Sequence, residues 1–67
     1  MTKNKFRELA AERVLKLRPT WSLRKADHFV VVALKYAEID FEKANRADVR
    51  AFAEKAVKDR GEVWIWN

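Results

Sequence analysis

The chain has 67 residues, with 15 lysines and arginines against 10 aspartates and glutamates, so its net charge is +5 at neutral pH. A chain of this length forms one domain, because it is too short to enclose two hydrophobic cores. It has no cysteine and one histidine, which excludes a disulfide framework and a cysteine–histidine zinc site. The longest apolar run, residues 29–34, is far shorter than the roughly 20 residues that span a bilayer, so we expect no membrane insertion.

The positive charge is concentrated in the first 25 residues. Eight basic and two acidic side chains lie there, so 8 − 2 gives +6, whereas the rest of the chain has seven basic and eight acidic side chains and sums to −1. Such an asymmetry favours association with anionic partners. The alternative is a solvated surface that only keeps the protein soluble.

The first predicted element is an amphipathic helix over residues 4–17. Asn4 or Thr2 is the candidate cap, and Pro19 disfavours helical geometry at the preceding residue and so ends the helix. Arg13 falls inside the apolar stripe, where its stem packs while its guanidinium pairs or reaches solvent, or where it acts as a buried specificity residue. The apolar residues that share one face at helical spacing are Phe6, Leu9, Ala10, Val14 and Leu17.

A second helix is predicted over residues 21–39, with Thr20 or Ser22 as its cap. The β-branched residues 30–32 are also compatible with a strand, but their neighbours and the length of the segment favour a helix. A helix that is apolar on nearly all sides is usually buried on more than one side, so we expect it to lie between the other two. One stripe consists of Leu23, Ala26, Val30, Ala33, Leu34 and Ala37, and the other of Trp21, Phe29, Val32, Tyr36 and Ile39.

A third helix is predicted over residues 46–60, after a short connection. Asn45 and Asp48 resemble a capping box, although the usual residue at the second position is Glu or Gln. Gly61 suits the left-handed position that follows a helix. The predicted core face consists of Val49, Phe52, Ala53, Ala56 and Val57.

The last residues, 62–67, change to the alternating pattern of an extended segment. Two tryptophans at an exposed terminus would be a liability, so the tail either closes the bundle as a hydrophobic lid or docks on a partner. The sequence therefore predicts an all-α fold. It is a single domain over residues 1–67, a small three-helix bundle with a short extended C-terminal tail.

Catalysis finds little support in the sequence. His28 is the one histidine, and the chain has no cysteine, no glycine-rich phosphate loop and no pair of histidines at metal-binding spacing. A lone histidine on a helix is far more often a surface residue than a general base. We expect no enzyme activity, no cofactor, no metal site and no small-molecule substrate.

Nucleic-acid binding through a basic N-terminal surface is the slightly favoured function, because basic residues occur together with aromatic ones. The start of the second helix offers backbone N–H groups, hydroxyls and cations to a phosphate. The short turn before it resembles a helix-turn-helix, but the usual glycine is missing and the second helix is too apolar for a DNA groove. The third helix is the alternative recognition helix. The candidate residues are Arg7, Lys16, Arg18, Thr20, Ser22, Arg24, Lys25, Arg46 and Arg50.

A protein partner is the rival hypothesis. Tryptophan is enriched at binding hot spots, and an apolar terminal strand can pair with the edge of a partner's sheet. The candidate residues are Trp64, Ile65 and Trp66, and the partner would be an acidic protein surface or a second copy in a homodimer. In either case we expect a small regulatory or accessory binding protein, or an inhibitor. We expect it in the cytoplasm, since a chain without cysteine suits a reducing compartment.

Overall fold

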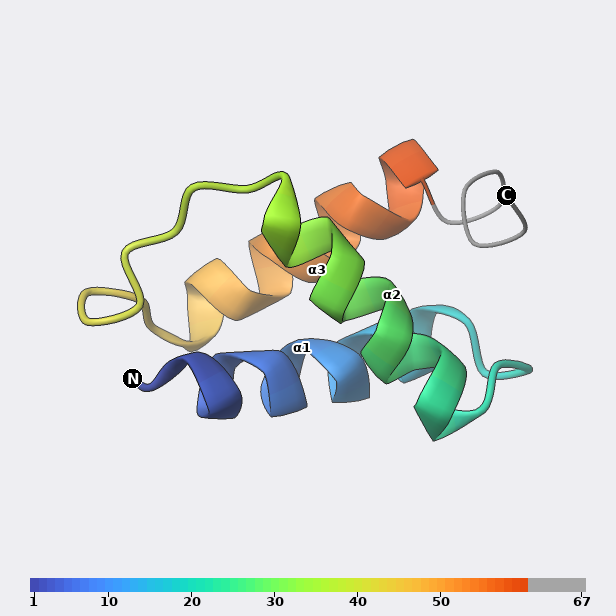
Figure 1. The fold of residues 1–67 in the computed structure, drawn as a ribbon. Coiled ribbons are helices and arrows are strands. Elements are labelled where there is room, and N and C mark those ends of the chain that lie inside the picture. Colours follow the sequence, from blue (N-terminus) through green and yellow to red (C-terminus); the bar gives the residue numbers. More distant parts are fainter. Residues whose placement is uncertain (61–67) are drawn as a thin grey trace.

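Three α-helices make up the part of the chain that the computed structural model describes, residues 1–60. They are α1 (Lys3–Leu17), α2 (Leu23–Lys35) and α3 (Arg46–Arg60), and no β-strand occurs between residues 1 and 60 (Figure 1). The predicted all-α three-helix bundle is therefore confirmed. The predicted extended tail, residues 62–67, lies outside the described residues. None of the three helices is long and apolar enough to cross a membrane.

The ends of α1 follow from local chemistry. The backbone N–H of Lys5 donates to the Thr2 hydroxyl at 3.1 Å, so Thr2 and not Asn4 is the cap. The helix ends at Leu17, as expected from the proline two residues later. The N–H of Arg18 donates to the carbonyl of Val14 at 2.8 Å and closes the last turn.

The second helix is shorter at both ends than the predicted range of 21–39. Its cap is Ser22, whose hydroxyl accepts a hydrogen bond from the backbone N–H of Lys25 at 3.1 Å. At the other end the N–H of Tyr36 donates to the carbonyl of Ala33 at 3.2 Å, a tighter final turn. Ile39 packs against the core from the connecting segment instead of continuing the helix. Tertiary packing thus overrides the apolar periodicity of residues 36–39.

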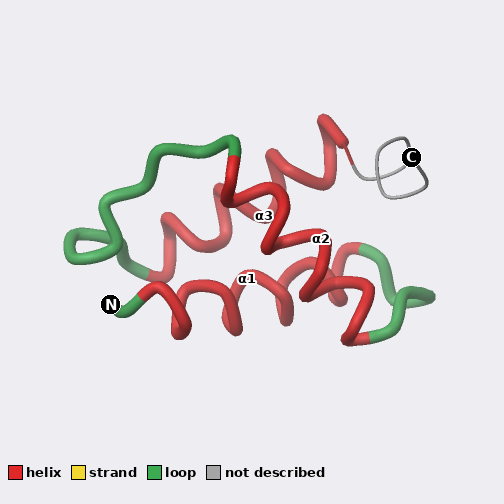
Figure 2. The backbone as a smooth tube through the Cα atoms, viewed as in Figure 1, coloured by secondary structure: helices red, strands yellow, loops and turns green. Residues whose placement is uncertain are grey.

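The central helix is α1, and the prediction that the second helix would be central is wrong. α1 packs along both of its neighbours, whereas α2 and α3 touch each other little (Figure 2). Two apolar residues of α2's predicted stripes face solvent, since Leu23 is 61% and Tyr36 is 70% exposed. In α1 the adjacent Ala10 and Ala11 are both buried, and their small side chains let a helix approach on each side.

The core is built around two phenylalanines with no exposed surface, Phe6 and Phe29. The ring of Phe6 makes edge-on contacts with the rings of Phe41 and Phe52, at centroid distances of 5.3 and 5.5 Å. Every core residue except Ala11 belonged to a predicted apolar stripe. The core consists of Phe6, Ala10, Ala11, Val14, Ala26, Phe29, Val30, Ala33, Val49, Ala53, Ala56 and Val57.

The predicted capping arrangement at the start of α3 is confirmed. The backbone N–H of Asn45 donates to Asp48 Oδ2 at 2.9 Å, and the backbone N–H of Asp48 donates to Asn45 Oδ1 at 3.0 Å. We expect Asn45→Ala to lower the free energy of unfolding by about 1 kcal/mol, because it leaves a helix N–H group without its partner. Urea unfolding followed by circular dichroism measures the change. Asn4→Ala, the same substitution without a capping role, is the control, and an equal effect of the two would contradict the prediction.

Candidate functional site

The structure divides the predicted nucleic-acid-binding residues into three groups instead of gathering them in one groove. Lys16, Arg46 and Arg50 line a groove between α1 and α3. Arg7 and Arg24 line a different groove, between α1 and α2. The remaining four lie at the end of α1, in the connection or at the start of α2, and are Arg18, Thr20, Ser22 and Lys25.

The first groove, here called the α1–α3 groove, has a net excess of positive charge among the described residues that line it. α1 and α3 begin at the same end of the molecule and run in the same general direction, so the first turns of α3 lie beside α1 (Figure 1). The groove has a volume of about 160 Å³. Of the seven described residues that line it, four are cationic and one is acidic. They are Leu9, Glu12, Arg13, Lys16, Arg46, Val49 and Arg50.

Arg13 joins the two walls of this groove. Its Nη2 donates to Glu54 Oε1 at 2.9 Å, so the guanidinium pairs, which was one of the roles that the sequence left open. A half-exposed pair of this kind contributes only about 0 to 1 kcal/mol to stability. The pair also neutralises the charge of Arg13, one of the four cations of the groove. Lys16, Arg46 and Arg50 remain as exposed cations beside it.

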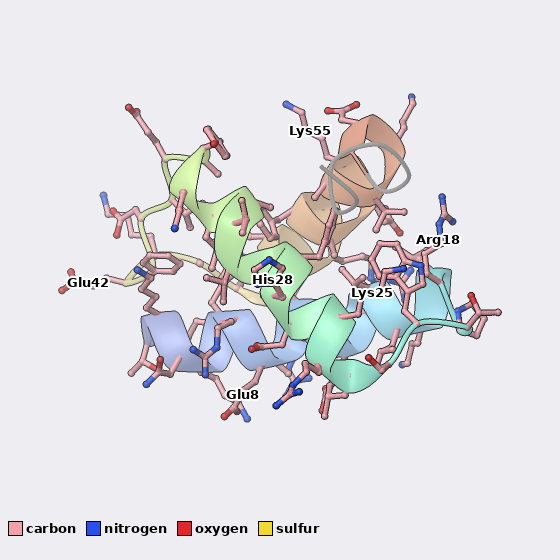
Figure 3. The ribbon with its side chains drawn as sticks, turned by 45° about the vertical axis from the view of Figure 1, so that its right-hand side comes forward. Glu8, Arg18, Lys25, His28, Glu42 and Lys55 are labelled. Atoms are coloured by element: carbon pink, nitrogen blue, oxygen red, sulfur yellow. The ribbon has the colours of Figure 1, made fainter. Side chains whose placement is uncertain are left out.

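The group at the connection is engaged in local structure. The Ser22 hydroxyl caps α2 and accepts a hydrogen bond from the backbone N–H of Lys25. This N–H is one of the groups predicted to bind a phosphate. The Lys25 ammonium lies 4.6 Å from the centroid of the Trp21 ring, at the same end of the molecule as Arg18 (Figure 3). Trp21 also contacts the buried Phe29 edge-on at 5.4 Å. Trp21 therefore packs against the core and is not among the described residues that line the α1–α3 groove.

The second groove, here called the α1–α2 groove, has a volume of about 510 Å³ and carries charges of both signs. Arg7 Nε lies 3.3 Å from Asp27 Oδ1, and Glu8 and Glu12 also line the groove. This mixture suits a polyanion poorly. Leu23 also lines the groove, although its place in an apolar stripe predicts a core residue, and the sequence therefore did not predict this surface. The basic and acidic residues at outward positions of the first helix are the feature of the sequence that could have predicted it.

Two other parts of the chain were considered from the sequence, namely His28 and the C-terminal tail. His28 is exposed on α2 (Figure 3), and residues 1–60 contain no group of three or more His, Cys, Asp or Glu side chains that could hold a metal ion. The docking residues Trp64, Ile65 and Trp66 lie outside the described residues, so their role stays a prediction.

Comparison with known proteins gives no guide to the function. No protein-family model matches the chain, and neither the curated proteins nor the solved structures contain a similar protein at the significance required. The inference therefore depends on the chain's own side chains. Among the three groups, the α1–α3 groove has the most cations, which come from two helices, and a single carboxylate among its described lining residues, which makes it the candidate site.

Proposed function

We propose that this protein is a non-catalytic accessory or regulatory protein that holds the phosphate backbone of a nucleic acid in the α1–α3 groove. The observation that carries the proposal is the meeting of four cations from two helices far apart in the sequence. Arg13 and Lys16 come from α1, and Arg46 and Arg50 from α3. Cations along such a groove gain affinity by displacing the counterions condensed on a polyanion.

The size of the groove favours a backbone contact over a small-molecule ligand. Its volume of about 160 Å³ is below the roughly 300 to 1,000 Å³ of typical ligand pockets. A phosphate needs less room, and arginine can grip it with two parallel N–H donors while lysine supplies a point charge. The site therefore suits successive phosphates that pass over the surface.

The composition of the groove favours binding that does not depend on base sequence. None of the described residues that line it is aromatic, so these residues offer no platform on which a base could stack. Contacts to phosphate position a protein on a nucleic acid but carry no direct sequence information. We expect duplexes to bind with the same affinity before and after their sequence is scrambled, and single strands likewise.

The test compares two double charge reversals of equal net charge. Lys16→Glu with Arg50→Glu changes the groove, whereas Lys35→Glu with Lys55→Glu changes two exposed lysines outside it. Fluorescence anisotropy with a labelled duplex at low salt measures the dissociation constant. We expect the groove variant to bind at least about tenfold more weakly than the control variant, because it replaces two phosphate contacts by repulsion.

Two outcomes would contradict the proposal. An equal loss in both variants would show that only the net charge matters and that the groove is not a site. The absence of any binding by the unmodified chain at low salt would exclude nucleic acid as the ligand. Circular dichroism of each variant checks that the helices are retained, since all four substituted side chains are exposed.

A further inference from the structure

The α1–α2 groove exposes a large apolar side chain among charges. Leu23, at the first position of α2, is 61% exposed beside the buried Ala11. Arg24 lies next to it in the sequence, and Glu8 and Glu12 follow one another on α1 at a helical spacing of four residues. A single exposed leucine is common on protein surfaces, so the charges around Leu23 decide whether this groove is an interaction surface.

Three of the charges around Leu23 lack partners within the described chain. Arg7 pairs with Asp27, but no ion pair within 4 Å joins Arg24, Glu8 or Glu12 to another of residues 1–60. Within residues 1–60, the groove thus carries one cation without an ion-pair partner, on α2, and two such carboxylates, on α1. Opposite charges lie on opposite walls of the same groove.

We infer that the α1–α2 groove binds a second copy of this chain in a two-fold symmetric dimer. In such a dimer a surface meets itself, so it must be self-complementary. Here Arg24 of each copy meets Glu8 and Glu12 of the other, and the two Leu23 side chains pack together near the axis. The α1–α3 groove cannot act in this way, because its excess of cations would repel itself.

The dimer would leave both α1–α3 grooves accessible. Leu9, Arg13 and Lys16 lie on a different side of α1 from Arg7 and Ala11 at 100° per residue. Glu12 lines both grooves and is the one carboxylate among the described residues that line the α1–α3 groove. Its pairing with Arg24 of the second copy removes that opposing charge. The dimer itself does not depend on the proposed nucleic-acid function.

Charge-swap complementation tests this interface. One variant carries Arg24→Glu and the other carries Glu8→Arg with Glu12→Arg, all at exposed positions. Each variant alone brings like charges together across the axis, so we expect the dimer dissociation constant to rise at least tenfold. Mixed in equal amounts, the two variants restore complementary pairs, and a heterodimer should form. Sedimentation velocity measures each sample at concentrations up to about 1 mM, where an association of about 4 kcal/mol is visible.

Further variants distinguish this interface from other ways of associating. Leu23→Glu should also give a monomer, whereas Arg50→Glu, in the other groove, should leave the dimer unchanged. Circular dichroism checks that every variant retains its helices. An unmodified chain that stays monomeric at the highest concentration would overturn the inference. So would a dimer that survives the charge reversals and Leu23→Glu, or two reversed variants that fail to associate when mixed.

Discussion

Replacing Phe6 by alanine is expected to remove about 3 to 5 kcal/mol of the free energy of unfolding, a large fraction of what a domain of this length has. Phe6 has no exposed surface, and its ring contacts Phe41 from the connection and Phe52 from α3. Truncation of a buried phenylalanine costs about 3 to 5 kcal/mol. A domain of this length has a free energy of unfolding of only about 3 to 10 kcal/mol, from about 0.05 to 0.15 kcal/mol per residue.

Urea unfolding followed by far-ultraviolet circular dichroism measures this loss, at concentrations low enough to keep the chain monomeric. Leu23→Ala is the control, because it truncates a large apolar residue that is 61% exposed. We expect that substitution to change the free energy of unfolding by no more than about 0.5 kcal/mol. A cooperative transition of the Phe6→Ala protein near that of the unmodified chain would show that the core does not form around Phe6.

The affinity for nucleic acid is expected to fall about 40- to 150-fold between about 50 and 200 mM salt. This range follows from three to four phosphate contacts. Lys16, Arg46 and Arg50 are the exposed cations of the α1–α3 groove, and Arg13 is a fourth that Glu54 already engages. Each phosphate contact adds about 0.9 to the slope of the logarithm of affinity against the logarithm of salt concentration.

The slope also identifies which residues make the contacts. In the Lys16→Glu and Arg50→Glu variant, the slope should be shallower by the amount that about two phosphate contacts contribute. The Lys35→Glu and Lys55→Glu control should keep the slope of the unmodified chain. Anisotropy titrations at four or more salt concentrations give these slopes. A slope near zero for the unmodified chain, or an equal reduction in both variants, would contradict a phosphate site in this groove.

The sequence was sufficient to predict local structure. Apolar residues at helical spacing predicted three helices and nearly all of their buried faces, because a stripe on a helix must be covered. Pro19 predicted the end of α1, and Asn45 with Asp48 predicted the start of α3, because these residues act on backbone groups within four positions. The end of α2 was not predictable in this way, because Ile39 packs against residues distant in the sequence.

The candidate site was only partly visible in the sequence. Lys16, Arg46 and Arg50 were all predicted as candidates. Nothing in their spacing showed that they line one groove and that Arg24 and Lys25 lie elsewhere. The sequence left two roles open for Arg13, and only the hydrogen bond to Glu54, 41 positions away, decided between them. Charges gather according to which helix faces meet, and the sequence does not state which faces meet.

The sequence by itself therefore determined the number of helices, the candidate residues for their caps and nearly all of the side chains that are buried, since each depends on neighbours within one or two turns. Only the tertiary structure decided that α1 is the central helix, that Leu23 and Tyr36 face solvent, and that the candidate cations fall into three groups. The physical reason is that a hydrophobic stripe is non-directional. It requires burial but does not select its partner, and the fit of whole helix surfaces makes that selection.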